Sequence, residues 1–119
     1  MQNSPKDLRK KILGRKGEDL TCLYLKKNGY KILERNYKTP YGEADIVALK
    51  DDTYCFVEVK TRTSDEYGLP SEAVDYKKQA RYRKIAWYYC TKRGEEVNCR
   101  FDVASIMDGE LDYFENAYI

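Results

Sequence analysis

Two adjacent segments of the chain alternate between apolar and polar residues in the way that β-strands do. Residues 42–49 and 54–61 are rich in β-branched and aromatic side chains, and a polar break at residues 50–53 separates them. This pattern predicts a β-hairpin. The second segment is apolar on one face and half apolar on the other, which is typical of a central strand covered on both sides.

The loop between the two segments decides which side chains face each other. A two-residue turn at residues 51–52 places Lys50 opposite Thr53, and the same register then places Asp45 opposite Glu58. A four-residue loop keeps that register, whereas a three- or five-residue loop would shift it. Directly opposed Cβ atoms lie about 4.5–5.5 Å apart. Two carboxylates so close repel each other unless one is protonated or a cation lies between them.

Alternation along the second strand adds a lysine to this pair. Glu58 and Lys60 are two residues apart and therefore project from the same face, while Val57 and Val59 point to the other. The predicted register also places Glu43 opposite Lys60. Charged side chains on a covered strand are seldom without a partner or a task, so this cluster is the candidate functional site.

Start and stop signals predict the remaining elements. Ser4 and Pro5 would begin a helix that Gly29 ends, and Asp108-Gly109 would form a hairpin turn. The expected elements are a helix over 5–28, a strand over 30–38, a turn over 39–42, the hairpin, a loop over 63–70, a helix over 72–93, and strands over 97–107 and 110–115. This order predicts an α/β fold with an αβββαβ core, in which helices flank a mixed central sheet. Residues 1–119 would form a single domain.

The composition is that of an ordinary globular protein. Of the 119 residues, 42% are hydrophobic and 35% are charged. No apolar run approaches the roughly 18 residues of a membrane span, and the first residues lack the apolar core of a signal peptide. We therefore expect a cytoplasmic protein with no membrane partner.

Cysteine and histidine usage narrows the chemistry. The four cysteines form no C-x-x-C pair and the chain has no histidine, which argues against a structural zinc site and against a histidine general base. We expect four buried, reduced cysteines. Catalysis would rest on carboxylates, lysine and a metal that prefers oxygen ligands.

The net charge of +2 is unevenly distributed. Residues 1–38 carry 11 basic and 4 acidic side chains, and residues 71–93 carry 7 and 2; residues 39–70 and 94–119 are net acidic. Basic helices around an acidic centre suit a polyanion such as a nucleic acid. The alternative is that these lysines and arginines only solvate the exposed helix faces.

Several motifs together resemble the YraN-like family of small bacterial proteins, over about residues 12–106. They are Gly17-Glu18, Gly29-Tyr30, Arg35-Asn36-Tyr37, Gly42-Glu43-x-Asp45, Phe56-Val57-Glu58-Val59-Lys60-Thr61-Arg62, Lys78-Gln79 and Arg100-Phe101-Asp102-Val103. Asp45 with Glu58-Val59-Lys60 also resembles the PD-(D/E)xK signature of the restriction-endonuclease-like fold, to which archaeal Holliday-junction resolvases belong. Here Ala44 stands where that signature has proline, and Gln79 is not followed by a tyrosine four residues on.

The resemblance implies a catalytic site of Glu18, Asp45, Glu58, Lys60 and Gln79. The metal, Mg²⁺ or Mn²⁺, would be held by Glu18, Asp45, Glu58 and the Val59 carbonyl. Lys60 would orient or activate water, and Gln79 would lie beside the site. The implied activity is metal-dependent endonucleolytic hydrolysis of DNA, on branched, recombination or repair intermediates.

The basic segments would supply the contacts to nucleic acid. The predicted contact residues are Arg15, Lys16, Arg62, Lys77, Lys78, Arg81 and Lys84. Two other interpretations remain open: a nucleic-acid-binding module or assembly subunit that does not cut, and a purely structural ion network. The run Trp87-Tyr88-Tyr89 would pack in the core or at the interface of a homodimer, or stack on bases.

Overall fold

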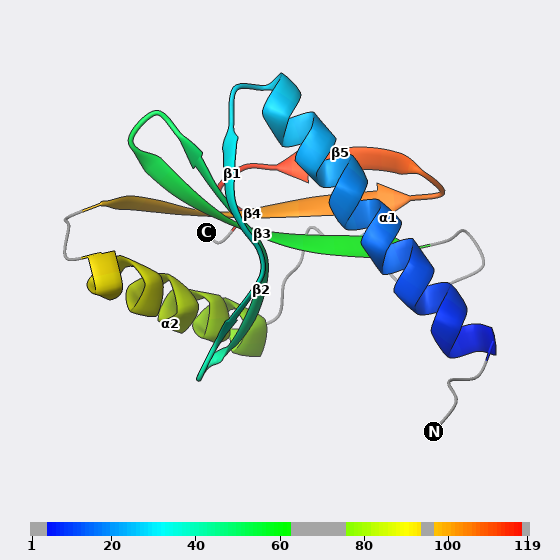
Figure 1. The fold of residues 1–119 in the computed structure, drawn as a ribbon, viewed down its shortest axis with the longest axis horizontal. Helices are drawn as coiled ribbons and strands as arrows, with labels where there is room; N and C mark the ends of the chain where they lie inside the picture. The colour runs from blue at the N-terminus through cyan, green and yellow to red at the C-terminus, as the bar shows by residue number, and fades with distance from the viewer. Residues whose placement is uncertain (1–4, 63–75, 94–96, 118–119) are drawn as a thin grey trace.

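The computed structural model describes residues 5–62, 76–93 and 97–117. In this part of the chain two helices and five strands follow one another in the predicted order. Their bounds are α1 (Pro5–Lys27), β1 (Lys31–Thr39), β2 (Gly42–Lys50), β3 (Thr53–Arg62), α2 (Tyr76–Arg93), β4 (Asn98–Met107) and β5 (Glu110–Phe114) (Figure 1). The predicted loop over 63–70 and the first residues of the predicted helix over 72–93 lie outside the described residues.

The five strands form one sheet with the order β1-β2-β3-β4-β5. Neighbouring strands are antiparallel except β3 and β4, which are parallel. A parallel pair needs a crossover connection, and α2 lies on that crossover. The predicted mixed α/β fold with an αβββαβ core is confirmed, and β5 adds a strand at the edge.

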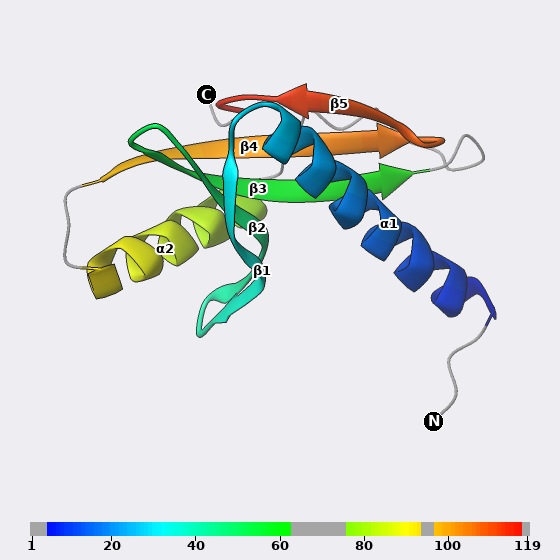
Figure 2. The ribbon, with the colours of Figure 1, turned by 45° about the horizontal axis from the view of Figure 1, so that its top comes forward.

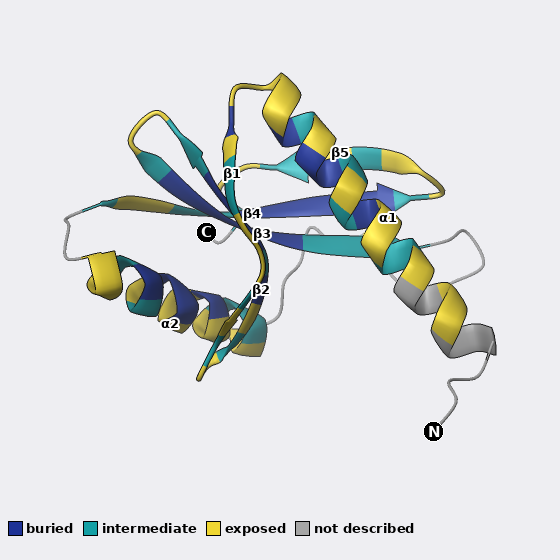
Figure 3. Ribbon diagram, in the orientation of Figure 1, coloured by how far each residue is buried: buried dark blue, intermediate teal, exposed yellow. Residues whose placement is uncertain are grey.

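The two helices cover opposite faces of the sheet, as the two views in Figures 1 and 2 show. The α1-side core consists of Cys22, Leu25, Tyr30, Ile46, Ala48, Cys55, Val57 and Ala104. The α2-side core consists of Ala44, Val47, Tyr54, Phe56, Tyr82, Ile85, Ala86, Tyr89 and Val103. Strand β3 contributes to both, and Figure 3 shows the buried residues gathered along the sheet centre and the inward sides of the helices. The prediction that this strand is central and covered on both sides is confirmed.

Helix α1 is continuous from Pro5 to Lys27 and ends as its sequence predicts. Gly29 has a φ of +85°, a left-handed conformation that glycine adopts without steric cost. The amide of Gly29 donates to the Lys26 carbonyl and the amide of Tyr30 donates to the Leu25 carbonyl. This pair of hydrogen bonds is a Schellman motif, and it turns the chain directly into β1.

Gly17 lets α1 approach the end of β3. A Cβ atom at this position would lie 2.3 Å from the Thr61 hydroxyl oxygen and 3.1 Å from the Ile106 Cδ1 atom. Thr21, one turn later, is buried and donates its hydroxyl to the Gly17 carbonyl. The close approach therefore places the next residue, Glu18, beside the C-terminal half of β3.

Cysteine burial differs in part from the prediction. All four cysteines are reduced and Cys22 and Cys55 are buried, but Cys90 is only partly buried and Cys99 is exposed. Cys99 is the second residue of β4, and the first two residues of this strand are exposed. Neither helix in the described residues is long and apolar enough to span a membrane.

The Gly17 contact makes a testable prediction. Gly17→Ala should destabilise the fold by about 1–3 kcal/mol, because the added methyl group overpacks the α1–β3 contact. Gly14→Ala is the matched control, since no atom lies within 4 Å of its added Cβ and alanine favours a helix by up to about 1 kcal/mol. Urea unfolding measures both variants. Equal stabilisation by both substitutions would contradict the close approach.

Candidate functional site

The predicted register of the β2–β3 hairpin is confirmed along its first half. Lys50 pairs with Thr53 across the turn at residues 51–52, and the ladder continues to the pair Ile46–Val57. The prediction that the ladder itself continues to Asp45–Glu58 and then to Glu43–Lys60 is wrong. Pairing stops at Ile46, and β2 turns away from β3 at that point (Figure 1).

Asp45 occupies the place where the two strands separate. Its carboxylate accepts a hydrogen bond of 2.8 Å from the Val59 amide, so a side chain satisfies a backbone donor of β3. Its own amide donates to the Tyr82 hydroxyl on α2 at 3.2 Å. Ala44 belongs to the α2-side core and Ile46 to the α1-side core, so the usual alternation of faces is broken at Asp45. These two hydrogen bonds fix its carboxylate in the gap between the strands.

Glu58 lies on β3 under α2 and is only 3% exposed. Its Oε1 atom forms an ion pair with the Lys78 ammonium group. Its Oε2 atom is buried and has no hydrogen-bond partner among the described residues. A buried carboxylate oxygen without a partner is costly, and it is therefore a position that a cation or a ligand donor would stabilise.

The pKa of Asp45 reflects its burial and the charges of the groups around it. The pKa of this carboxyl is raised from its ordinary value to about 6, chiefly by burial and also by the negative charges of Glu18 and Glu58. The hydrogen bond from Val59 and the positive charge of Lys78 act in the opposite direction and lower it. The carboxylates of α1, β2 and β3 are thus close enough to repel one another, as the sequence predicted for Asp45 and Glu58.

Glu18 stands at the edge of this group. Its side chain is mostly buried, and one oxygen lies 3.7 Å from the Arg35 guanidinium. Within residues 5–62, 76–93 and 97–117, no three histidine, cysteine, aspartate or glutamate side chains are close enough to form a metal site. The three-carboxylate ligand set, with the Val59 carbonyl, remains a prediction; both Glu18 and Glu58 act on Asp45 through their charge.

Asp45 and Glu58 carry the type of oxygen ligand that a hard divalent cation prefers. Asp45 and Glu58 offer carboxylate oxygens, and Mg²⁺ is commonly bound through one or two carboxylates together with phosphate oxygens and waters. The unpartnered Glu58 Oε2 atom and the raised pKa of Asp45 both indicate an excess of negative charge. The Lys78 ammonium group offsets part of that charge from α2.

The other predicted residues fall into two groups. Lys60 is partly buried on β3, two residues beyond Glu58, and Gln79 is partly buried beside Lys78 on α2. The predicted nucleic-acid contacts at exposed positions are Arg15, Lys16, Lys77, Arg81 and Lys84, while Arg62 is partly buried at the end of β3. Lys78, a predicted nucleic-acid contact, forms an ion pair with Glu58, and its contact with nucleic acid stays a prediction.

Sequence reasoning missed the pairing of Lys78 with Glu58 and the contact of Tyr82 with Asp45. Lys78, Tyr82, Ile85 and Tyr89 recur at helical spacing, and the last three are buried. Because residues at i, i+4, i+7 and i+11 share one helix face, this stripe carries the signal that Lys78 also points inward.

A second buried acid provides a contrast with Glu58. Asp102 on β4 is fully buried, and it accepts hydrogen bonds from the Arg100 guanidinium, the Tyr113 hydroxyl and the Asn116 amide. Both of its oxygens are used. The hydrogen bond and the charge of Asp102 raise the pKa of Arg100, and burial and Asp102 raise that of Tyr113. Asp102 is thus a satisfied structural acid, which Glu58 is not.

The fold and the site define a small mixed α/β protein with a carboxylate pair between diverging strands. A family model described as uncharacterised protein family UPF0102 matches residues 17–106, which include the whole candidate site. The chain therefore belongs to the UPF0102 family, in agreement with the YraN-like resemblance of its motifs.

Several relatives match along nearly their full length. A UPF0102 protein of Dictyoglomus thermophilum is 50% identical over 115 residues, covering 91% of this chain and 98% of the relative. A UPF0102 protein of Thermodesulfovibrio yellowstonii is 44% identical, and the match covers 89% of this chain and 95% of the relative. A UPF0102 protein of Alkaliphilus metalliredigens is also 44% identical, and the match covers 91% of this chain and 98% of the relative.

The Asp45 environment predicts a pH-dependent gain in stability for Asp45→Asn. The pKa of Asp45 is higher in the folded state than in the unfolded chain, so its ionisation destabilises the fold as pH rises from about 4 to about 6. The asparagine side chain keeps an acceptor for Val59 but never ionises. Above pH 6 the variant should be more stable than wild type by on the order of 2 kcal/mol, and the difference should vanish towards pH 4.

Urea unfolding between pH 4 and pH 8 measures this difference. Asp112→Asn, which removes an exposed acid on β5, is the control and should follow the wild-type pH dependence. A constant difference between Asp45→Asn and wild type over the whole range would show that ionisation of Asp45 is not what limits stability.

Proposed function

We propose that this protein is a metal-dependent nuclease that hydrolyses phosphodiester bonds in DNA. The observation that carries the proposal is the buried Glu58 carboxylate, one oxygen of which has no partner among the described residues, beside an Asp45 whose pKa is raised by burial and by neighbouring acids. A purely structural network would be expected to satisfy its buried atoms, as Asp102 does. A cation site instead requires acidic side chains whose negative charge the protein leaves partly unneutralised.

The arrangement of elements supports the same proposal. A helix, three antiparallel strands, a second helix and a strand parallel to the third follow one another here. That order is similar to the core of the restriction-endonuclease-like fold, whose PD-(D/E)xK signature Asp45 and Glu58-Val59-Lys60 resemble. Proteins of that fold include the archaeal Holliday-junction resolvases, so branched recombination or repair intermediates are the substrates to test first.

Each residue has a role in this proposal. Asp45 and Glu58 would hold Mg²⁺ or Mn²⁺, with the Val59 carbonyl and Glu18 as further ligands. The ion would supply Lewis acidity and a nucleophilic water at neutral pH. Lys60, on the same strand face as Glu58, would pair with a phosphate oxygen and stabilise its developing charge.

Asp45 would change its protonation state as the site fills. Near pH 6 it is about half protonated, and it would lose that proton when it binds a cation. Before a cation binds, the Lys78 ammonium group neutralises part of the negative charge of Glu58. Gln79 and the exposed cations would position the phosphate backbone of the substrate.

One observation favours the second candidate, a nucleic-acid-binding module that does not cut. Lys78 already places a positive charge on Glu58. If that ion pair persisted with substrate bound, Glu58 would be unable to accept a metal, and the basic residues alone would give salt-sensitive binding.

Cleavage assays distinguish the two candidates. Wild-type protein with Mg²⁺ or Mn²⁺ should cut at least one substrate among linear duplex, single strand, flap and four-way junction, and EDTA should stop it. Glu58→Ala and Lys60→Ala should each lower the rate by about 100-fold or more, because they remove a cation ligand and a phosphate partner. Both variants should keep the fold and the affinity for DNA, measured by circular dichroism and fluorescence anisotropy.

Glu110→Ala, which removes an exposed acid at the start of β5, is the control and should cut like wild type. Salt-sensitive DNA binding without metal-dependent cleavage of any substrate would support the binding module. Cleavage that Glu58→Ala leaves undiminished would locate the activity elsewhere, or in a contaminating nuclease.

A further inference from the structure

An exposed aromatic cluster lies where the β1–β2 turn meets α2. Trp87 is 61% exposed and Tyr41 is 42% exposed. The Tyr41 ring contacts Trp87 edge-on at a centroid distance of 6.5 Å and Tyr88 at 6.2 Å. We call these three residues the aromatic platform. Tyr89, the next residue, is buried, so the predicted core packing holds for it and not for Trp87.

Positive charge surrounds the aromatic platform. The Lys84 ammonium group lies 6.0 Å from the centre of the Tyr41 ring, and that of Lys92 lies 4.5 Å from the centre of the Tyr88 ring. The side chain of Arg81 packs against Gly42, where an added Cβ would lie 2.6 Å from the Arg81 Cδ atom. The whole of α2 carries seven lysines and arginines and no acidic residue.

The aromatic platform and the candidate site share helix α2. Helix α2 carries Lys78 and Tyr82, which contact Glu58 and Asp45, and it carries Trp87 further along. At about 1.5 Å per residue, Lys78 and Trp87 are about 14 Å apart along the helix axis, which is about four nucleotides at the 3.4 Å spacing of B-DNA. Nine residues are two and a half helical turns, so Trp87 projects from the side of α2 opposite Lys78, and a strand that reached both would pass around the helix.

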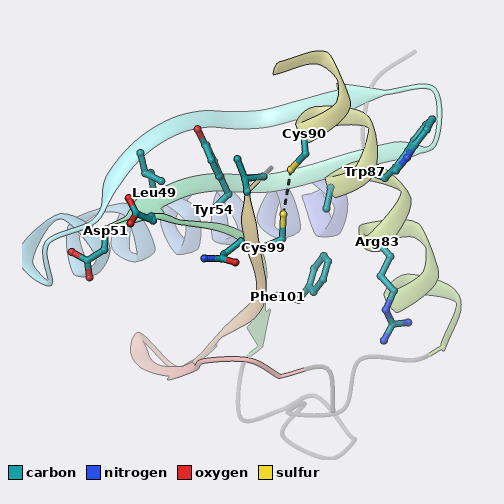
Figure 4. Close-up of a pocket in the computed structure, with 12 residues that line it drawn as sticks. Leu49, Asp51, Tyr54, Arg83, Trp87, Cys90, Cys99 and Phe101 are labelled. Carbon is teal, nitrogen blue, oxygen red and sulfur yellow. Dashed lines mark hydrogen bonds between the residues drawn. The ribbon is translucent and has the colours of Figure 1, made fainter. Parts of the chain in front are cut away.

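An open hollow of about 1020 Å³ lies on the other side of Trp87. Figure 4 shows Trp87 and Arg83 on α2 at one wall of this hollow, with Phe101 on β4 between Arg83 and Cys99 and Asp51 at the far end. Trp87 thus borders free space and is available to a planar ligand. Asp51, with its neighbour Asp52, would repel phosphate from the far end, so a polyanion would follow α2.

We propose that the aromatic platform binds the unpaired bases of a single-stranded nucleic-acid segment. Aromatic side chains beside cations stack on the bases of single strands, and base pairing hides those base faces in a duplex. This inference deepens the proposed function: it rests on nucleic acid being the substrate, and it assigns that substrate a single-stranded part such as a flap, a gap or the open centre of a junction.

Charge decides against a second copy of the chain as the occupant. Two α2 helices brought together at Trp87 would bring like charges together, since Arg83 and Lys84 lie near Trp87 and α2 carries no acidic residue, and like charges in an interface oppose association. A polyanion complements the same surface.

The intrinsic fluorescence of the protein tests this directly, because Trp87 is the one tryptophan in the sequence. In EDTA, which prevents metal-dependent cleavage, a 12-nucleotide oligothymidylate should quench Trp87 in a saturable way, and a 12-base-pair duplex should not. Tyr41→Ala should weaken single-strand affinity by about 5- to 100-fold. Trp87→Ala, measured by the anisotropy of a labelled oligonucleotide, should do the same, and Trp87→Phe should restore most of the affinity.

Leu23→Ala is the matched control, since it removes an exposed apolar side chain from α1 and should leave the affinity unchanged. Equal quenching by single strand and duplex would overturn the inference, as would unchanged single-strand affinity in Tyr41→Ala and Trp87→Ala. A dimer by sedimentation velocity that Trp87→Ala dissociates, with no quenching by the oligonucleotide, would overturn it in favour of self-association.

Failure of the proposed function would look different. Glu58→Ala should abolish cleavage while Trp87 quenching persists. Quenching of Trp87 without cleavage of any substrate would support single-strand binding by the aromatic platform and contradict the proposed hydrolysis. Cleavage that Tyr41→Ala leaves unaffected, with unchanged Trp87 fluorescence, would support hydrolysis and contradict single-strand binding by the aromatic platform.

Discussion

The hydrogen bond from the Val59 amide to the Asp45 carboxylate is the interaction on which the candidate site depends. It lies where β2 and β3 stop pairing, and it replaces a backbone acceptor with a side chain. The strands can therefore separate without leaving the Val59 donor buried and unsatisfied. The same bond directs an acid into the gap, close to Glu58 and Glu18, at the cost of a raised pKa.

The surrounding elements maintain this arrangement from both faces of the sheet. Gly17 brings α1 close to the end of β3 and so places Glu18 near Asp45. On the other face, α2 holds Asp45 through Tyr82 and offsets the charge of Glu58 through Lys78. Because α2 also carries the aromatic platform, a single helix connects the proposed cation site with the proposed single-strand contact.

The features that the sequence predicted correctly are those that depend on a few neighbouring residues. The turn at residues 51–52 sets the hairpin register, and Gly29 ends α1, because each depends on a few neighbouring residues. The separation of the strands at Asp45 was not predicted, since it requires a donor from β3 and a hydroxyl from α2 that are distant in sequence. The inward direction of Lys78 and the exposure of Trp87 also depend on how α2 is rotated against the sheet, which tertiary packing decides.

The central claim is that Asp45 and Glu58 together form a site for a hard divalent cation. Titration with Mn²⁺, followed by the electron paramagnetic resonance signal of the free ion, tests it without any substrate. Wild-type protein should bind one Mn²⁺ per chain, and Asp45→Asn and Glu58→Gln should each weaken binding by about 10-fold or more, while Asp102, left intact in both, keeps the fold. Binding that is equal in all three proteins, or absent from wild type, would contradict the claim.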